Sequence, residues 1–272
     1  MEILTFLQYS FIQKAFFAGS FVAIVCSTLG LFLVLRKMSL IGDGLSHVSF
    51  GAIALGLFLG IYPFYVAIPV VMIASILILK ISEKIKAYED AAIGIISSLG
   101  IAGGVILASV SKGFNVDLFS YLFGNILTVT SVDLIIMLIL DLVIIMVVFL
   151  FYKEFLALSF DDEFATVVGV PTVKLYFLLL CLIALTIVVL MKVVGIIMII
   201  ALLTIPAAIS KQYTSNLKKM IFISILLSAI FGLGGLWLSY QLNLASGATI
   251  VIVSGIGFIL SWFGKQGRIL QV

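Results

Sequence analysis

Charged side chains are scarce in this sequence. Only 10% of its 272 residues are Asp, Glu, Lys or Arg, whereas 64% are hydrophobic. Soluble globular domains contain roughly 25% charged residues, so this composition excludes an ordinary soluble enzyme or binding domain. The net charge of +3 gives no indication of a nucleic-acid partner. We therefore expect a protein that is surrounded by membrane lipid and binds no nucleic acid.

Residues suited to chemistry are scarce as well. The two cysteines, Cys26 and Cys181, lie in separate apolar runs without the spacing of a metal site, so we interpret them as buried apolar residues. The phosphate-binding motif G-x-x-x-x-G-K-[ST] is absent, because Gly264-Lys265 is followed by Gln266. We predict that the chain is not an enzyme and holds no tightly bound cofactor. If ATP drives it, a separate polypeptide must hydrolyse the ATP.

Long apolar runs make up most of the chain. A helix of about 20 apolar residues can cross a bilayer. We predict an all-α integral membrane protein, a polytopic bundle of eight or nine transmembrane helices in one domain over residues 1–272. The lower number applies if one glycine-rich run does not cross fully. Residues 117–130 are too short and too interrupted to cross, and we interpret them as a re-entrant or interfacial helix. The predicted spans are 12–35, 40–59, 62–80, 91–110, 132–152, 173–190, 193–210, 220–240 and 246–264.

The placement of lysine and arginine predicts the orientation. Cytoplasmic loops of membrane proteins carry an excess of these residues. If the turn 36–39 lies in the cytoplasm and the spans alternate, twelve basic residues face the cytoplasm and three face outward. With nine spans, the N-terminus is then outside and the C-terminus cytoplasmic. The three outward residues are Lys14, Lys112 and Lys192.

Asp43 and His47 are the strongest candidates for a site. His47 is the only histidine in the chain and follows Asp43 by four residues in an apolar segment. Residues i and i+4 share one face of a helix, and a carboxylate with an imidazole can bind zinc, manganese or iron. Ionisable groups inside a membrane are costly and normally face a bundle interior or an aqueous path. The pair indicates a metal path, an Asp–His hydrogen bond that only joins helices, or a proton relay.

Asp133 and Asp141 form a second acidic pair, eight residues apart on roughly one face of a predicted span. Asp133 falls near the end of the span, where a carboxylate costs little, whereas Asp141 lies deeper. We expect a structural role for Asp141, paired with hydroxyl or backbone groups of a neighbouring helix. A secondary site on a metal path is the alternative.

The segment SFDDEFATVVGVP, residues 159–171, predicts a short cytoplasmic helix. Ser159 can cap its start with Asp162 in the capping-box position, and Gly169 can end it in the left-handed conformation. Acidic residues in the first turn suit the helix dipole, and a small Ala165 suits close approach of a partner. The segment indicates either a docking surface or a plain connection between spans. The residues assigned to it are Ser159, Asp161, Asp162, Glu163, Ala165 and Gly169.

Five segments carry motifs that occur together in this order. They are GLFLVLRKMSLIGDGLSHVSFGAIALG (30–56), YLFGNILTVTSVDL (121–134), SFDDEFATVVGVPT (159–172), VGIIMIIALLTIPAAIS (194–210) and GLWLSYQLNLASGATIV (235–251). Together they resemble the permease subunits of zinc and manganese ABC importers over nearly the whole chain.

The resemblance implies a type II ABC importer permease in the bacterial cell membrane. It would form a homodimer, dock two copies of a cytoplasmic ATP-binding subunit, and receive its ion from an extracellular metal-binding protein. By resemblance, Asp43 and His47 fall on the family's intramembrane metal path, and residues 159–171 fall on its ATPase-coupling helix.

The identity of the transported ion depends on a smaller difference. The stretch SHVSFGAIALG lacks the Leu-Pro-Gly that many manganese and iron members carry after the histidine, so the resemblance favours zinc, with manganese or iron as the alternative. An ion-coupled secondary transporter would be expected to show an inverted repeat and more intramembrane ionisable groups. An intramembrane metalloenzyme would need H-E-x-x-H or similar spacing, which one histidine cannot supply.

Overall fold

The computed structural model describes residues 10–84, 89–110, 120–124, 126–160 and 162–269. Eight of its helices are long and apolar enough to cross a membrane, and the described part contains no strand. The all-α, multi-pass prediction is therefore confirmed. The long helices are α2 (Ser10–Leu35), α3 (Leu40–Phe58), α4 (Pro63–Lys84), α5 (Glu89–Val110), α7 (Ser131–Leu150), α10 (Thr172–Tyr213), α11 (Leu217–Leu242) and α12 (Ser246–Ile269). The short ones are η2 (Ile126–Thr128), α8 (Tyr152–Phe160) and α9 (Asp162–Val167).

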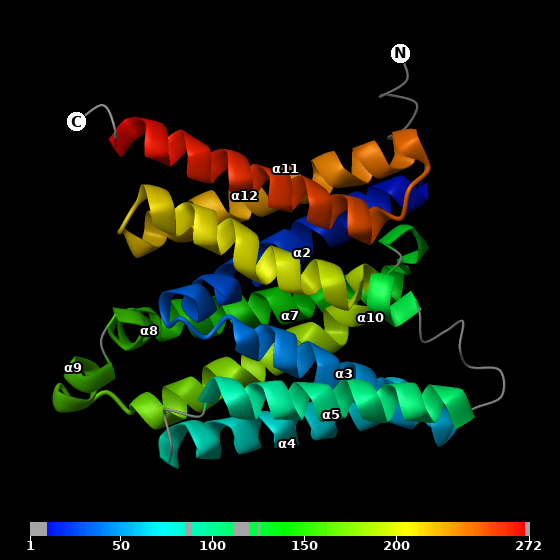
Figure 1. Ribbon diagram of the computed structural model, residues 1–272, viewed down its shortest axis with the longest axis horizontal. Coiled ribbons are helices and arrows are strands. Elements are labelled where there is room, and N and C mark those ends of the chain that lie inside the picture. Colours follow the sequence, from blue (N-terminus) through cyan, green and yellow to red (C-terminus); the bar gives the residue numbers. More distant parts are fainter. Residues whose placement is uncertain (1–9, 85–88, 111–119, 125, 161, 270–272) are drawn as a thin grey trace.

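Helix α10 is a hairpin rather than one rod. Its backbone leaves the helical region at Gly195, where φ is 77° and ψ is 161°. Near its start, the Tyr176 ring lies 4.6 Å from Cζ of Arg36, and near its end Nζ of Lys211 lies 3.3 Å from the carbonyl oxygen of Val34. A straight helix would hold Tyr176 and Lys211 about 50 Å apart. Both ends of α10 therefore lie beside the end of α2, and Figure 1 shows the chain reversing direction between them.

The two arms of α10, residues 172–194 and 196–213, are each long enough to cross a bilayer. They correspond to the predicted spans 173–190 and 193–210. Counting the arms separately raises the crossing segments of the described chain from eight to nine. The break falls at glycine because only a residue without Cβ adopts this positive φ at little cost.

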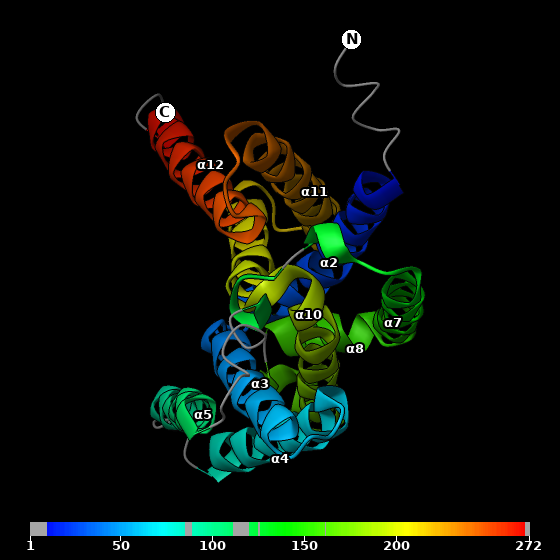
Figure 2. The same ribbon diagram turned by 90° about the vertical axis from the view of Figure 1, so that its right-hand side faces the viewer.

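The helices surround a centre formed by α2 and α10, which are the most buried of the long helices. Helices α3, α4 and α5 pack together on one side, and α11 and α12 pack on the other (Figure 2). Helix α7 lies at the periphery, mainly against α2. Metal-path candidates on α3 therefore lie between the central helices and α5.

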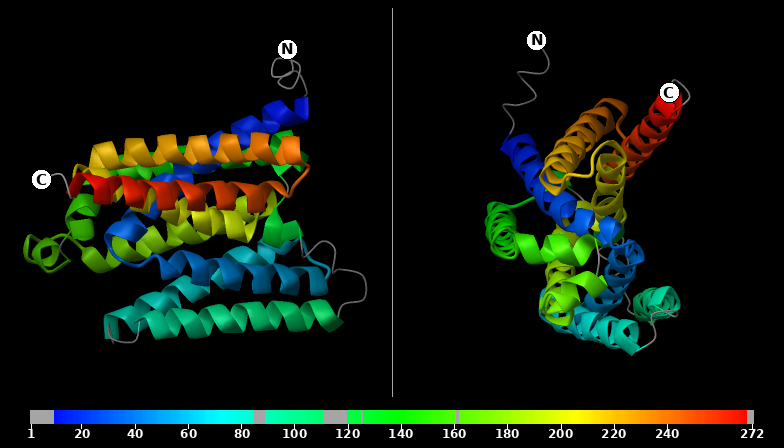
Figure 3. Two further views of the ribbon diagram at one scale, coloured as in Figure 1. Left: turned by 45° about the horizontal axis from the view of Figure 1, so that its top comes forward. Right: turned by 90° about the vertical axis from the view of Figure 1, so that its left-hand side faces the viewer.

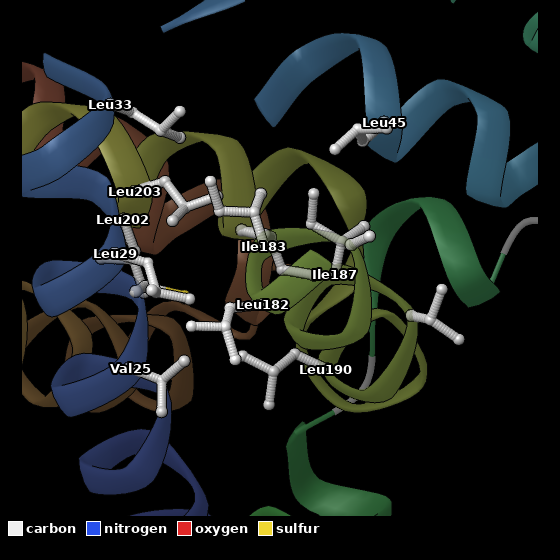
Figure 4. Packing of buried hydrophobic residues seen from close by; sticks show 14 of the residues in the cluster. Val25, Leu29, Leu33, Leu45, Leu182, Ile183, Ile187, Leu190, Leu202 and Leu203 are labelled. Carbon is white, nitrogen blue, oxygen red and sulfur yellow. The ribbon is translucent and has the colours of Figure 1, made fainter. Parts of the chain in front are cut away.

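The core contains aliphatic side chains from α2 and from both arms of α10. Leu29 and Leu33 of α2 lie beside Leu203 of the second arm, with Ile183 of the first arm close by (Figure 4). Gly30 permits this approach, because a Cβ there would collide with the backbone of Leu203. Lipid is as apolar as these side chains, so moving them out of lipid gives no hydrophobic gain. The helices are held together here by van der Waals contact between closely packed side chains.

Three glycines meet at one end of the bundle, and we name them the glycine junction: Gly124, Gly195 and Gly247. A Cβ on Gly124 or Gly195 would collide with the backbone of the other segment, and one on Gly247 would lie 2.5 Å from the carbonyl oxygen of Phe123. Helix η2 packs against α2 and α10, and the described parts of the predicted re-entrant segment are too short to cross a bilayer; residues 117–119 and 125 of that prediction lie outside the described residues. The described parts of that segment are 120–124 and 126–130.

The other end of the bundle, which we name the basic end, carries most of the lysine and arginine. There α2 and α4 end, α8 and α9 lie, the first arm of α10 begins, its second arm ends and α11 begins (Figures 1 and 3). Helix α2 begins at the opposite end and α12 ends at the basic end. Basic residues in these helix ends and turns include Arg36, Lys37, Lys80, Lys153, Lys174, Lys211, Lys218 and Lys219.

Candidate functional site

Asp43 and His47 lie in the first two turns of α3. Oδ2 of Asp43 is 3.6 Å from Nδ1 of His47, so the two side chains face each other as the spacing predicts. The Asp43 side chain is 38% exposed and the His47 side chain 23%. Asp43 also lies in the first turn of α3, where the helix dipole favours a negative charge. The pair therefore presents a carboxylate and an imidazole from one helix face, accessible at the surface of a single chain.

Helix α5 supplies a third polar group to this pair. Oγ of Ser97, a buried residue, lies 2.6 Å from Nδ1 of His47. The two helices touch at glycines, because a Cβ on Gly51 would collide with the carbonyl of Gly100, and one on Gly100 would lie 2.7 Å from the carbonyl oxygen of His47. This close backbone approach allows a short serine side chain on α5 to reach the imidazole.

One chain offers too few donors to enclose a metal ion. The atoms available at α3 are the Asp43 carboxylate and Nε2 of His47, because Nδ1 is occupied by Ser97. Among the residues that the structure describes, no group of three or more His, Cys, Asp and Glu side chains comes together. An ion at this pair therefore needs ligands from water or from a second copy of the chain.

Asp141 lies on α7, apart from that pair. It is 3% exposed, and neither carboxylate oxygen has a hydrogen-bond partner in the described structure. Cys26 of α2 lies in its neighbourhood. Since α7 packs mainly against α2, with α10 between α7 and α3 (Figure 2), a role for Asp141 on the ion path stays a prediction. The expected hydroxyl or backbone partner is not present among the described contacts.

Asp133 lies at the start of α7 and is fully engaged. Its carboxylate accepts hydrogen bonds from the backbone and hydroxyl of Thr130, which forms a capping box with it. Its Oδ1 also lies 3.0 Å from Nζ of Lys192. As the sequence analysis predicted, Asp133 lies at one end of its span, and its carboxylate stabilises the first turn of α7.

The predicted acidic helix is divided into the end of α8 and the short α9. Ser159 does not cap it: the residue lies inside α8, and its Oγ donates a hydrogen bond to the carbonyl of Phe155 at 2.6 Å. The capping prediction is wrong because α8 continues through Ser159, so that its hydroxyl bonds backward within the helix. Asp161 and the side chain of Asp162 lie outside the described residues, and Asp162 begins α9.

The end of α9 follows the prediction. Gly169 has a φ of 88°, its N–H bonds to the carbonyl of Thr166 at 3.0 Å, and the N–H of Val170 bonds to the carbonyl of Ala165 at 3.0 Å. This pair of bonds is the Schellman motif, which requires a left-handed residue after the helix.

The exposed face of α9 is apolar, which the sequence analysis missed. Phe164 and Val167 of α9, and Val168 directly after it, are 61%, 86% and 63% exposed, and Glu163 is exposed beside them; we count Val168 with this face. Ala165 is fully buried within the chain itself, so it cannot be the contact point for a partner. The sequence could have predicted this surface. The acidic residues of the segment indicate that it lies outside the lipid, where neighbouring Phe and Val side chains form an apolar patch that is typical of a contact site.

Arg36 connects this region to the helix that carries Asp43 and His47. It lies in the turn between α2 and α3, donates to the carbonyl of Leu158 in α8 at 3.3 Å, and stacks over the Tyr176 ring at the start of α10. Arg36 therefore connects the turn before α3 to α8, which precedes α9, and to the start of α10, which follows α9.

Comparisons with known proteins agree with this architecture. The model of the ABC 3 transport family matches residues 8–265. The manganese transport system membrane protein MntC of Listeria monocytogenes is 39% identical, over 97% of this chain and 95% of that protein. The high-affinity zinc uptake system membrane protein ZnuB of Haemophilus influenzae is 32% identical, over 95% of this chain and 99% of that protein. A chain of PsaBC from Streptococcus pneumoniae, solved in complex with Fab, aligns with a TM-score of 0.86 at 37% identity, covering 96% of this chain and 94% of that one.

Proposed function

Since this chain belongs to the ABC 3 transport family, we propose that it is the membrane-spanning subunit of an ATP-driven importer of a divalent metal ion. The observation that carries the proposal is the Asp43–His47 pair, which faces outward from one side of a helix that is otherwise apolar or small. Ionisable groups at such a place in a membrane protein mark a substrate path.

A second copy of the chain completes the proposed path. Each protomer contributes one carboxylate and one imidazole nitrogen, so two protomers related by a two-fold axis contribute four ligands. The exposure of both side chains in a single chain supports this arrangement, because an ion path confined to one protomer would bury them. Water molecules fill any remaining coordination positions. Water ligands exchange readily, which suits an ion that must also be released.

We propose manganese as the first candidate ion and zinc as the second. Relatives named for manganese transport reach 39% identity, against 32% for the relative named for zinc uptake. The missing Leu-Pro-Gly after His47 favours zinc instead. The donor types suit both ions, so uptake must be measured for both.

The basic end faces the cytoplasm in this proposal, as the excess of lysine and arginine there predicts. The sequence has no phosphate-binding loop of its own, so a separate subunit must bind the ATP. That subunit docks at the basic end, because ATP is in the cytoplasm. Its seat is the apolar face of α9, formed by Phe164, Val167 and Val168. Arg36 then gives ATPase movement a direct connection to the start of α3.

The test is uptake of Mn²⁺ and Zn²⁺ by cells that lack their own importer and express this chain with its partner proteins. Asp43→Ala and His47→Ala should each reduce uptake at least ten-fold, because an uncoordinated cation must otherwise cross the membrane interior. Asp90→Ala, which removes an exposed carboxylate from the start of α5, is the matched control and should transport normally. Undiminished uptake by both site variants at equal expression would refute the metal path.

A further inference from the structure

Ser97 differs from most buried serines of the described structure because its hydroxyl bonds a side chain on another helix; Ser27 also bonds across helices, but to the backbone carbonyl of Ser224. Within this bundle, a helical serine typically donates its hydroxyl to the carbonyl four residues earlier in its own helix. Ser97 instead bonds across helices to the imidazole of His47, 50 residues away in sequence and 2.6 Å away in space. The serines with the local bond include Ser46, Ser49, Ser75, Ser159 and Ser254.

The close contact of α3 and α5 fixes this bond. Gly51 and Gly100 bring the two backbones together, and Gly100 lies one turn beyond Ser97 on α5. The contact leaves no room for a Cβ at either glycine. Ser97, which is 8% exposed, is therefore held against Nδ1 of His47, whose side chain as a whole is 23% exposed.

The position of the bond decides which ring nitrogen can bind an ion. A neutral imidazole has one N–H and one bare nitrogen, and only the bare nitrogen can ligate a metal. Both Ser97 Oγ and the Asp43 carboxylate lie on the Nδ1 side of the ring, at 2.6 Å and 3.6 Å. A carboxylate accepts only, so these neighbours favour the proton on Nδ1 and leave Nε2 bare.

Resting on the proposed function, we propose that Ser97 is the positioning residue of the metal path: its hydroxyl accepts the Nδ1–H of His47 and so presents Nε2 to the divalent ion. Metal-binding histidines usually donate their second ring N–H to a fixed acceptor, and loss of such a partner lowers metal affinity 10- to 100-fold. Ser97 is that acceptor, supplied by a different helix from the ligands. The relative position of α3 and α5 therefore governs the affinity of the path.

The single histidine makes the tautomer directly measurable. The full-length chain, purified with a tag that contains no histidine, is labelled with nitrogen-15 at the imidazole, so every signal comes from His47. At a pH where the ring is neutral, the spectrum should show Nδ1 protonated and Nε2 bare, and added Cd²⁺ should shift the Nε2 resonance. A protonated Nε2 in the unaltered chain would overturn the proposal without any variant.

Variants test the contribution of the hydroxyl. Ser97→Ala should give a mixture of both tautomers and weaken Cd²⁺ binding about ten-fold. Ser97→Thr, which keeps the hydroxyl, should restore both properties. Ser98→Ala is the matched control, because Ser98 is the exposed neighbour on the same helix. If Ser97→Ala keeps the tautomer and the affinity of the unaltered chain, Ser97 only joins two helices and the inference is wrong.

His47→Ala separates failure of this inference from failure of the proposed function. If Cd²⁺ binds the unaltered chain but not His47→Ala, the metal site stands and the Ser97 variants alone decide the positioning role. If Cd²⁺ binds His47→Ala as well as the unaltered chain, the proposed path is wrong, and the role of Ser97 is refuted with it.

Discussion

At the scale of single residues, Asp141 is a side chain that costs the fold stability. It is 3% exposed, and its two oxygens have no hydrogen-bond partner in the described structure. Leaving a buried polar group without a partner costs roughly 1–3 kcal/mol. Asp141→Leu keeps the branching of the side chain, with a larger volume, and removes both unpaired oxygens, so it should raise the free energy of unfolding by about 1 kcal/mol, measured in detergent by thermal or denaturant unfolding.

Asp133 on the same helix is the control for this change. Its carboxylate is engaged by Thr130 and Lys192, so Asp133→Leu should lower stability by about 0.5–2 kcal/mol through loss of the capping box. Metal uptake by Asp141→Leu decides its second role. We expect uptake to be retained, since Asp141 lies on α7 apart from α3. A stabilised variant that no longer transports would place Asp141 on the ion path.

The sequence predicts residue contacts within a helix better than contacts between helices. Asp43 and His47 face each other because spacing of four is fixed by helix geometry. The bond from Ser97 could not be predicted, since it depends on where α5 settles against α3 at Gly51 and Gly100. The role assigned to Ser159 failed for a related reason: a serine followed by an acidic residue resembles a cap only if the preceding helix has already ended.

At the scale of helices and turns, the exposed face of α9 carries a testable role. Val167 is 86% exposed, so Val167→Lys should leave the stability of the chain unchanged within about 0.5 kcal/mol. It should nevertheless weaken retention of the ATP-binding subunit, because a charge in an apolar contact remains unpaired on docking. Co-purification of the two subunits, with the permease tagged, measures this effect.

Ser215→Lys is the matched control for α9. Ser215 lies in the exposed turn before α11, also at the basic end, so the variant adds the same charge away from α9. Retention of the ATP-binding subunit should be normal in this control. Equal retention in Val167→Lys and the unaltered chain would mean that α9 only connects α8 to α10.

The helices themselves were largely predictable, and their arrangement was not. Runs of about 20 apolar residues located every span, and the boundary predicted at residues 191–192, beside the polar Lys192, lies three residues before the actual break at Gly195. The exposed Val167 was missed because periodicity has little meaning over the six residues of α9. Which helices occupy the centre depends on close backbone contacts such as Gly30 with Leu203, which no local pattern reveals.

At the scale of the whole molecule, the charge difference between the two ends predicts the orientation. Ser215→Cys, at the basic end, should resist a membrane-impermeant thiol reagent in intact cells, because that end faces the cytoplasm. Gln241→Cys, exposed at the opposite end of α11, should react. The unaltered chain serves as the blank for Cys26 and Cys181. If Ser215→Cys is labelled and Gln241→Cys is protected, the orientation of the chain in the membrane is the reverse of the predicted one.

Synthesis of this protein leaves the glycine junction unfinished until late. Gly247 follows Gly124 by 123 residues, so a ribosome delivers the two roughly 6–25 s apart at 5–20 residues per second. Through that interval the backbone at Phe123, and from its own synthesis onward the backbone at Val194, lacks the neighbour that α12 later provides. All the other long helices are therefore synthesised before the glycine junction can form. The junction is completed only when α12 packs against Phe123 and Val194.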